Sequence, residues 1–173
     1  MQEVKIRLRF NRECLGFAKK SVRNGQGVIY RMPRDGKGRV MFLPSWWKAS
    51  FRYAAKVVGR GHEDVKKIAW DPIVDGHLAE WKRIVKPARG SRRARYALHE
   101  AFRPNAVIGI NAVLPQGLSI DDFTELLATV GTYKGISPFQ AEEETYGTFE
   151  VVSVMPTIRV RQKSQPTESL KPS

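Results

Sequence analysis

Cysteine is almost absent from this sequence: Cys14 is the one cysteine among 173 residues. A single thiol excludes a disulfide framework within the chain and a zinc site built from several cysteines. Long apolar runs are also lacking, and no stretch approaches the roughly 20 apolar residues that a membrane-spanning helix needs. Residues 1–10 alternate charged and apolar side chains, a pattern that signal peptides do not have. We therefore expect a cytoplasmic protein without a membrane segment.

The motifs of nucleotide-binding and hydrolytic enzymes are missing as well. The sequence contains no Walker loop, dinucleotide fingerprint, nucleophile elbow or zinc-ligand spacing. His62, His77 and His99 lie in no diagnostic context, so an ordinary surface or core role is the better interpretation of each. Asp71, Asp75 and His77 could together hold a divalent ion, but Asp-Pro and Asp-Gly are plain turn signals. We predict a binding protein with no catalytic residue, metal or cofactor.

Acidic residues are scarce and unevenly placed. The chain has 30 Lys and Arg against 17 Asp and Glu, a formal net charge of +13. Residues 1–60 carry 15 of the cations and only three acids, whereas residues 101–154 carry two cations and seven acids. Such a basic surface is typical of proteins that bind polyanions. The alternative is that the charge serves solubility alone, which would not require this asymmetry.

The first strand is the clearest in the sequence. Apolar side chains from Val4 to Phe10 alternate with Lys5, Arg7 and Arg9, which predicts one core face and one cationic face. Like charges on one strand face are destabilising unless they are solvated or countered. The cationic face is therefore either exposed to water or a ligand surface, and this strand alone does not decide between them.

Two segments have the periodicity of amphipathic helices. Residues 44–58 begin at a proline and place Trp47 on the apolar stripe, and residues 119–130 begin at Ser119, a good N-cap residue. Trp46 cannot share the buried stripe with Trp47, so we predict that Trp46 is the more exposed of the two.

The remaining segments are shorter. Residues 28–32 and 39–43 flank an Asp-Gly turn and predict a hairpin. Residues 86–95 form a basic loop, and residues 155–173 a flexible basic tail after a single domain of residues 1–154. Further predicted strands lie within residues 65–74, 78–85, 96–102, 106–114 and 148–154.

The firm elements follow the order strand, helix, strand, strand, helix, strand. This order predicts an α+β, ferredoxin-like fold in which two helices cover one face of an antiparallel sheet. The other face of the sheet is then free for a ligand. The β-hairpin and the basic loop are insertions into this plan.

A resemblance to known proteins rests on three segments. They are residues 4–10 followed by Cys14-Leu15-Gly16, the Phe42-Leu43-Pro44 entry to a helix, and residues 131–138 leading to residues 146–151. Together they resemble small, mostly uncharacterised proteins of tailed bacteriophages. The closing helix, glycine-rich loop and strand are also similar to the RAMP superfamily of CRISPR-associated RNA-binding proteins. The resemblance covers most of residues 3–154 and implies a ferredoxin-like domain that holds RNA against such a loop. It also implies that, as an enzyme, the protein would be a metal-independent endoribonuclease.

The glycine-rich loop departs from the RAMP pattern. Gly131, Gly135 and Gly147 are widely spaced, and residues 142–144 are three adjacent glutamates that would repel a phosphate backbone. Lys134 and the backbone near Gly135 are then the part expected to touch RNA. The alternative is that the glycines only turn the chain.

From these features we predict non-catalytic binding of single-stranded RNA or single-stranded DNA, with RNA favoured, along cations that converge into one track. The sequence leaves the choice between the two open. The predicted binding residues are Lys5, Arg7, Arg9, Lys19, Lys20, Arg23, Arg89, Arg92, Arg93, Arg95 and Lys134 for phosphates, with Trp46 and Tyr96 for base stacking. The alternative is a phage-encoded module that inhibits or imitates part of a host RNA-guided CRISPR defence complex. Its partner would be a host or phage ribonucleoprotein complex. The sequence leaves oligomerisation open.

Overall fold

Strand β1 (Gln2–Phe10) lies inside a four-stranded sheet, between two antiparallel neighbours. The computed structural model describes residues 1–16, 22–24, 27–85, 95–138 and 145–157. The other elements are β2 (Cys14–Leu15), β3 (Val22–Asn24), β4 (Gly27–Tyr30), α1 (Pro44–Val57), α2 (His62–Lys66), β5 (Ala69–Trp70), β6 (Ala79–Val85), β7 (Arg95–Phe102), β8 (Val107–Leu114), α3 (Ile120–Thr129), the π-helical turn η1 (Val130–Lys134) and β9 (Phe149–Pro156).

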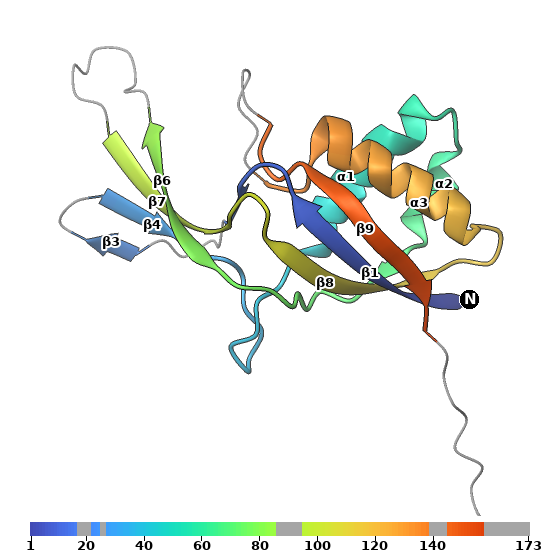
Figure 1. Cartoon of the computed structure of the whole chain (residues 1–173), viewed down its shortest axis with the longest axis horizontal. Helices are drawn as coiled ribbons and strands as arrows, with labels where there is room; N and C mark the ends of the chain where they lie inside the picture. Colours follow the sequence, from blue (N-terminus) through green and yellow to red (C-terminus); the bar gives the residue numbers. More distant parts are fainter. Residues whose placement is uncertain (17–21, 25–26, 86–94, 139–144, 158–173) are drawn as a thin grey trace, which may run out of the picture.

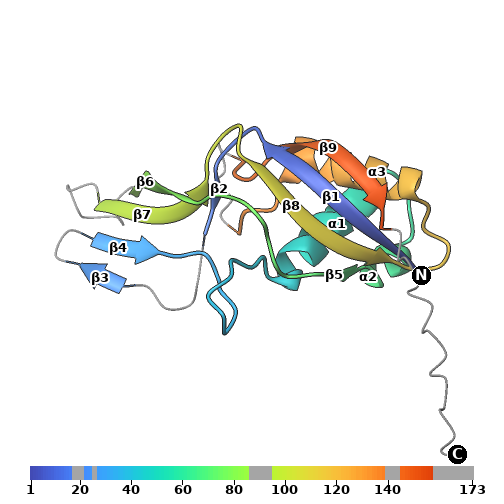
Figure 2. The ribbon, with the colours of Figure 1, turned by 60° about the horizontal axis from the view of Figure 1, so that its bottom comes forward.

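The first sheet has the strand order β5-β8-β1-β9, and every pair in it is antiparallel. With α1 between β1 and β5, and α3 between β8 and β9, this is the ferredoxin-like arrangement. Both helices lie on the same side of the sheet (Figures 1 and 2). The predicted fold class is therefore confirmed, with β5 reduced to two residues.

Apolar and charged residues alternate along β1, and the apolar row forms part of the hydrophobic core. Val4, Ile6, Leu8 and Phe10 are completely buried. They pack with apolar side chains of α1 and α3 in one continuous cluster that includes Phe51, Phe123 and Leu126. Ser119 caps α3 by accepting a hydrogen bond from the Asp122 N–H at 3.1 Å, as the sequence predicts. Among the described residues, no helix is long and apolar enough to cross a membrane.

The two insertions meet in a second sheet, which the sequence did not reveal. Its strand order is β2-β7-β4-β3, with β6 also paired to β7, and it extends away from the helices (Figure 1). The predicted hairpin of residues 28–32 and 39–43 is wrong, because β4 pairs with β3 and, in parallel, with β7. The turn after Asp35 does form, but only an isolated bridge joins Arg34 to Val40. A turn signal is local, whereas the choice of strand partner depends on distant residues.

Other boundaries also differ from expectation. Residues 65–74 contain the end of α2 and the short β5 rather than a longer strand. Strand β9 continues to Pro156, and the Thr157 N–H donates a hydrogen bond to the Glu3 carbonyl, so the predicted tail begins later than residue 155. Residues 158–173 lie outside the described part of the chain.

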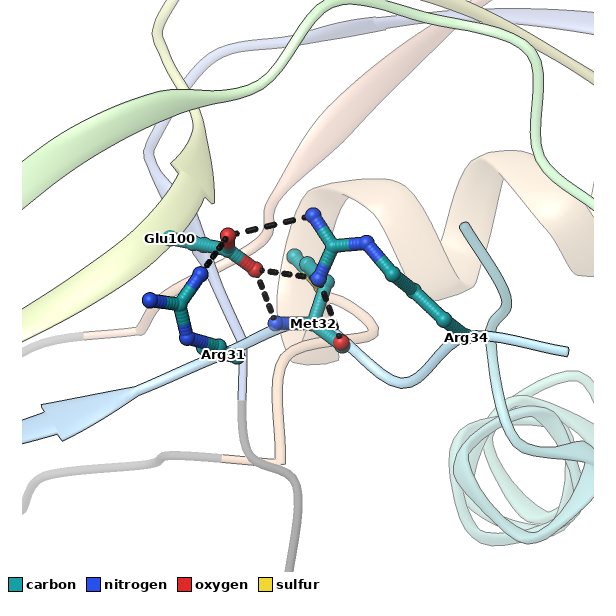
Figure 3. Close-up of polar contacts among 4 residues, drawn as sticks. All are labelled: Arg31, Met32, Arg34 and Glu100. Atoms are coloured by element: carbon teal, nitrogen blue, oxygen red, sulfur yellow. Dashed lines mark hydrogen bonds and ion pairs between the residues drawn. The ribbon is translucent and has the colours of Figure 1, made fainter. Parts of the chain in front are cut away.

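Glu100 on β7 ties the second sheet to the chain that leads toward α1 (Figure 3). Its carboxylate accepts hydrogen bonds from the Met32 N–H at 2.8 Å and from both terminal nitrogens of Arg34 at 2.8 and 3.1 Å, and Arg31 adds a contact at 3.3 Å. Partial burial opposes ionisation of Glu100, but the hydrogen bonds from Arg34 and Met32 outweigh it and lower the pKa of the carboxyl.

The glycines after α3 pack against other backbone segments. Gly135 adopts a left-handed φ of 67°, and a Cβ added there would lie 2.4 Å from the Tyr146 carbonyl oxygen. Its N–H donates to the Val130 carbonyl, and its own carbonyl accepts from Ser50 at 2.7 Å. Both polar groups of Gly135 are therefore occupied inside the protein, which favours the interpretation that these glycines shape the chain.

Replacing Gly135 by alanine should lower the free energy of unfolding by roughly 3 kcal/mol or more, because it combines backbone strain with a steric clash. The matched control is Gly36→Ala, where an added Cβ has nothing within 4 Å. Urea denaturation followed by circular dichroism measures both variants. Equally small effects would contradict this account of the loop.

Glu100→Gln should lower the free energy of unfolding by about 1–3 kcal/mol at pH 7. Because the pKa of Glu100 is lowered in the folded state, its contribution is complete above about pH 4.3 and is lost as pH falls through the folded pKa. The difference between wild type and variant should therefore shrink below about pH 4.3. Urea denaturation between pH 7 and pH 3 tests this, and a difference that does not vary with pH would argue against it.

Candidate nucleic-acid interface

The face of the first sheet that the helices leave open carries the cations of β1. Lys5, Arg7 and Arg9 are all exposed, opposite the buried apolar row. Their cross-strand neighbours on β8 are Asn111, Gly109 and Val107, in that order. On the other side, β9 places Met155, Ser153 and Glu150 beside them. The strand therefore presents three cations, and the neighbours of Arg7 on both sides, Gly109 and Ser153, are small.

These cations differ in how far they are neutralised. The Arg9 guanidinium contacts the Glu150 carboxylate at 2.5 Å, and both side chains remain about half exposed. Among the described residues, no carboxylate lies within ion-pair distance of Lys5 or Arg7. Their charge is left for solvent or a ligand.

A shallow hollow of about 330 Å³ opens beside these two cations. It is bounded by β1, by β8 and by the segment that follows β5. The lining residues are Lys5, Arg7, Asp75, Gly76, His77, Val107, Ile108 and Gly109. The segment is held on the sheet by paired backbone hydrogen bonds, from the Asp75 N–H to the Gly109 carbonyl at 3.0 Å and from the Gly109 N–H to the Asp75 carbonyl at 2.8 Å.

The histidines have separate environments. His99 is fully buried, with Nδ1 3.0 Å from the Gly16 carbonyl and its ring stacked on Tyr30. Burial lowers the pKa of His99, which favours the neutral ring. His62 begins α2 and accepts a hydrogen bond from Arg52. His77 lines the hollow, a position that the sequence did not indicate.

The two predicted stacking residues belong to elements other than β1, β8 and β9: Trp46 to α1 and Tyr96 to β7. Trp46 is half-buried whereas Trp47 is only 1% exposed, so the prediction that Trp46 is the more exposed of the two is confirmed. The Trp46 ring also packs against the core, and its centroid lies 5.5 Å from that of Phe42. Its role in base stacking stays a prediction. The apolar surface of α1 extends over both tryptophans because Phe42, just before the helix, contacts each ring. Tyr96 belongs to β7, and its side chain lies outside what the structure describes.

The other predicted contacts are spread over the molecule. Arg95 begins β7 at the end of the second sheet that is remote from β1 (Figure 1). Seven strand steps, about 23 Å, separate it from Phe102 near the core. Arg23 lies in β3, and Lys134 is half-buried at the end of η1. The predicted residues outside the described part of the chain are Lys19, Lys20, Arg89, Arg92 and Arg93. The described residues therefore bring together Lys5, Arg7 and Arg9, but not Arg95.

The predicted turn around Asp71 is confirmed, since its carboxylate accepts a hydrogen bond from the Ile73 N–H at 3.0 Å. Within the described ranges, no group of three or more His, Cys, Asp or Glu side chains is arranged to hold a metal ion.

Comparisons with known proteins find a similar fold but no family for this chain. No protein-family model matches the sequence, and neither does any curated protein. Among solved structures, a chain in the cryo-electron microscopy structure of the Type III-B Cmr-beta bound to cognate target RNA is similar, with a TM-score of 0.56 at 11% sequence identity. The match covers 90% of this chain and 60% of that chain. The likeness shows a common fold.

If single-stranded RNA binds the open face, as the sequence predicts, Glu150→Gln should raise the affinity a few-fold, because it releases Arg9 from its partner and removes a carboxylate from that face. An exposed ion pair stabilises the fold by about 1 kcal/mol at most, so the melting temperature should change little. Fluorescence anisotropy with a labelled oligonucleotide measures the affinity. An unchanged or lower affinity would show that Arg9 does not face the ligand.

Proposed function

We propose that this chain is a non-catalytic binder of single-stranded RNA that uses the open face of its ferredoxin-like sheet. The observation that carries the proposal is the pair Lys5 and Arg7, exposed at the centre of that face with no carboxylate of the described residues in ion-pair contact. Unpaired cations on a strand repel one another, and a phosphate backbone would relieve that repulsion. The fold it has in common with a chain of an RNA-bound complex supports RNA as the polyanion.

The geometry of the strand suits an extended polyanion. Lys5 and Arg7 are two residues apart, so their side chains emerge on the same face about 6.6 Å from each other. Each can then contact a different phosphate of one strand. The neighbouring positions Gly109 and Ser153 are small, which leaves the approach to Arg7 open. Arg9, Lys134 and the cations of residues 19–23 and 89–95 would add further phosphate contacts, chiefly as a sequence-independent attraction.

The double variant Lys5→Ala, Arg7→Ala should weaken binding of a single-stranded RNA by about 10-fold or more. It should also reduce the slope of log affinity against log salt by about 1.4, since each phosphate contact on a single strand contributes about 0.7. Fluorescence anisotropy at several salt concentrations measures both quantities. Single-stranded RNA should also rank above single-stranded DNA and above duplex competitors.

The matched control is Lys48→Ala, Lys56→Ala, which removes the same charge from the exposed face of α1 on the helix side of the molecule. This control should leave affinity nearly unchanged. If both double variants weaken binding equally, net charge rather than the open face explains the attraction. If neither does, RNA binds elsewhere on the molecule and the proposal that it uses the open sheet face is wrong.

A further inference from the structure

The hollow beside Lys5 and Arg7 has two chemically different walls. Strand β1 contributes the two cations, and the segment after β5 contributes Asp75 and His77. Gly109 of β8 lies between these two walls, directly opposite Arg7 in the strand register. Because it has no side chain, it leaves the space between the walls open. A ligand that fits must therefore be anionic at one end and offer hydrogen-bond donors or a flat face at the other.

The wall that carries Asp75 and His77 is held firmly in place. A Cβ added to Gly76 would lie 2.8 Å from Ile108 Cγ2 and 2.9 Å from Phe102 Cε1. The segment is therefore packed closely against these two side chains, beside β8. The two backbone hydrogen bonds between Asp75 and Gly109 hold the same segment to β8. The Asp75 Cβ is 3.6 Å from the place that a Gly109 Cβ would take. Asp75 thus occupies the space above this glycine.

A phosphate alone does not match this lining, because an ionised carboxylate accepts hydrogen bonds and repels anions. A nucleotide does match it, since it has a phosphate at one end and a base with donors at the other. The volume is at the lower end of the range for small-ligand pockets, about 300–1,000 Å³. Of the lining residues His77 alone has a ring, and histidine is one of the side chains on which unstacked RNA bases stack.

The Asp75 carboxylate also favours one RNA base, guanine, over the others. Guanine presents two adjacent donors, N1–H and the N2 amino group, which match the two oxygens of a carboxylate. Adenine and cytosine offer an amino group beside an acceptor, and uracil a single N–H. Paired charge-assisted hydrogen bonds are stronger than single ones and add geometric specificity.

We propose that the hollow is a nucleotide subsite for guanine: Lys5 and Arg7 bind the phosphate, Asp75 accepts hydrogen bonds from the guanine edge, and the His77 ring stacks on the base. This inference rests on the proposed function and adds base selectivity to it. It assigns roles to two residues that the sequence left as turn and surface positions.

The test uses the full chain and four fluorescent 12-mers of uridine, one unmodified and three with a single central guanosine, inosine or adenosine. Guanosine should bind about 5-fold or more tightly than uridine, since a good bidentate contact discriminates by about 1–3 kcal/mol. Inosine, which lacks the N2 amino group, should fall between them. In Asp75→Asn the ratio of guanosine to uridine affinity should fall to about one.

The matched control for Asp75→Asn is Glu125→Gln, which removes one negative charge at an exposed position of α3. This control should keep the guanosine preference. If Asp75→Asn instead raises the affinity for all four oligonucleotides equally, Asp75 only repels phosphate and the inference is overturned. Binding that depends on Lys5 and Arg7 but shows no guanosine preference in the wild type would also overturn it, while leaving the proposed function intact.

His77 is tested by two substitutions. His77→Ala should weaken binding of all four oligonucleotides by about 5-fold or more, the value expected for loss of a base–aromatic stack of roughly 1–3 kcal/mol. His77→Phe retains a ring without charge and should restore most of that affinity. Equal losses in both variants would exclude stacking by His77.

Discussion

The structure depends on the alternation of β1 at the centre of the first sheet. Because β8 and β9 pair with it on both edges, the strand has no freedom to rotate or slip, and a shift by one residue would bury three cations. Complete burial of Val4, Ile6, Leu8 and Phe10 against the helices therefore places Lys5, Arg7 and Arg9 on the open face. Hydrophobic packing on one side of the sheet positions the charges on the other.

The same constraint explains why only part of a strongly basic surface forms a site. Several cations are committed within the fold: Arg34 and Arg31 hold Glu100, Arg60 pairs with Asp122, and Arg39 pairs with Asp35. Lys5 and Arg7 have no such partner among the described residues, and they lie beside a hollow rather than on a convex helix face. The local arrangement of charge, more than the total of +13, distinguishes this part of the surface.

Local sequence patterns predicted the elements of the ferredoxin-like sheet well. The alternation of β1, the capping of α3 by Ser119 and the proline at the start of α1 each act within a few residues, so they can be read from the sequence. The parallel pairing of β4 with β7 joins residues about 70 positions apart and has no local signature. That is why the second sheet was missed and a hairpin was predicted in its place.

The site was predictable only on its β1 side. Lys5, Arg7 and Arg9 follow from the strand pattern, whereas the hollow requires three segments that are distant in sequence. Asp75-Gly76-His77 looks like an ordinary turn, and only the close contact of Gly76 with Ile108 and Phe102 brings its neighbours onto the sheet. The helical stripe correctly predicted that Trp46 is more exposed than Trp47, but it could not show that Phe42, just before the helix, packs against the Trp46 ring.

Photo-crosslinking tests most directly whether RNA lies on the open sheet face. A single-stranded RNA carrying 4-thiouridine would be irradiated with the full chain, and the crosslinked peptides located by mass spectrometry. The account predicts crosslinks on peptides from β1, β8 and the segment after β5. Crosslinks confined to α1 and α3, on the helix side of the sheet, would contradict it.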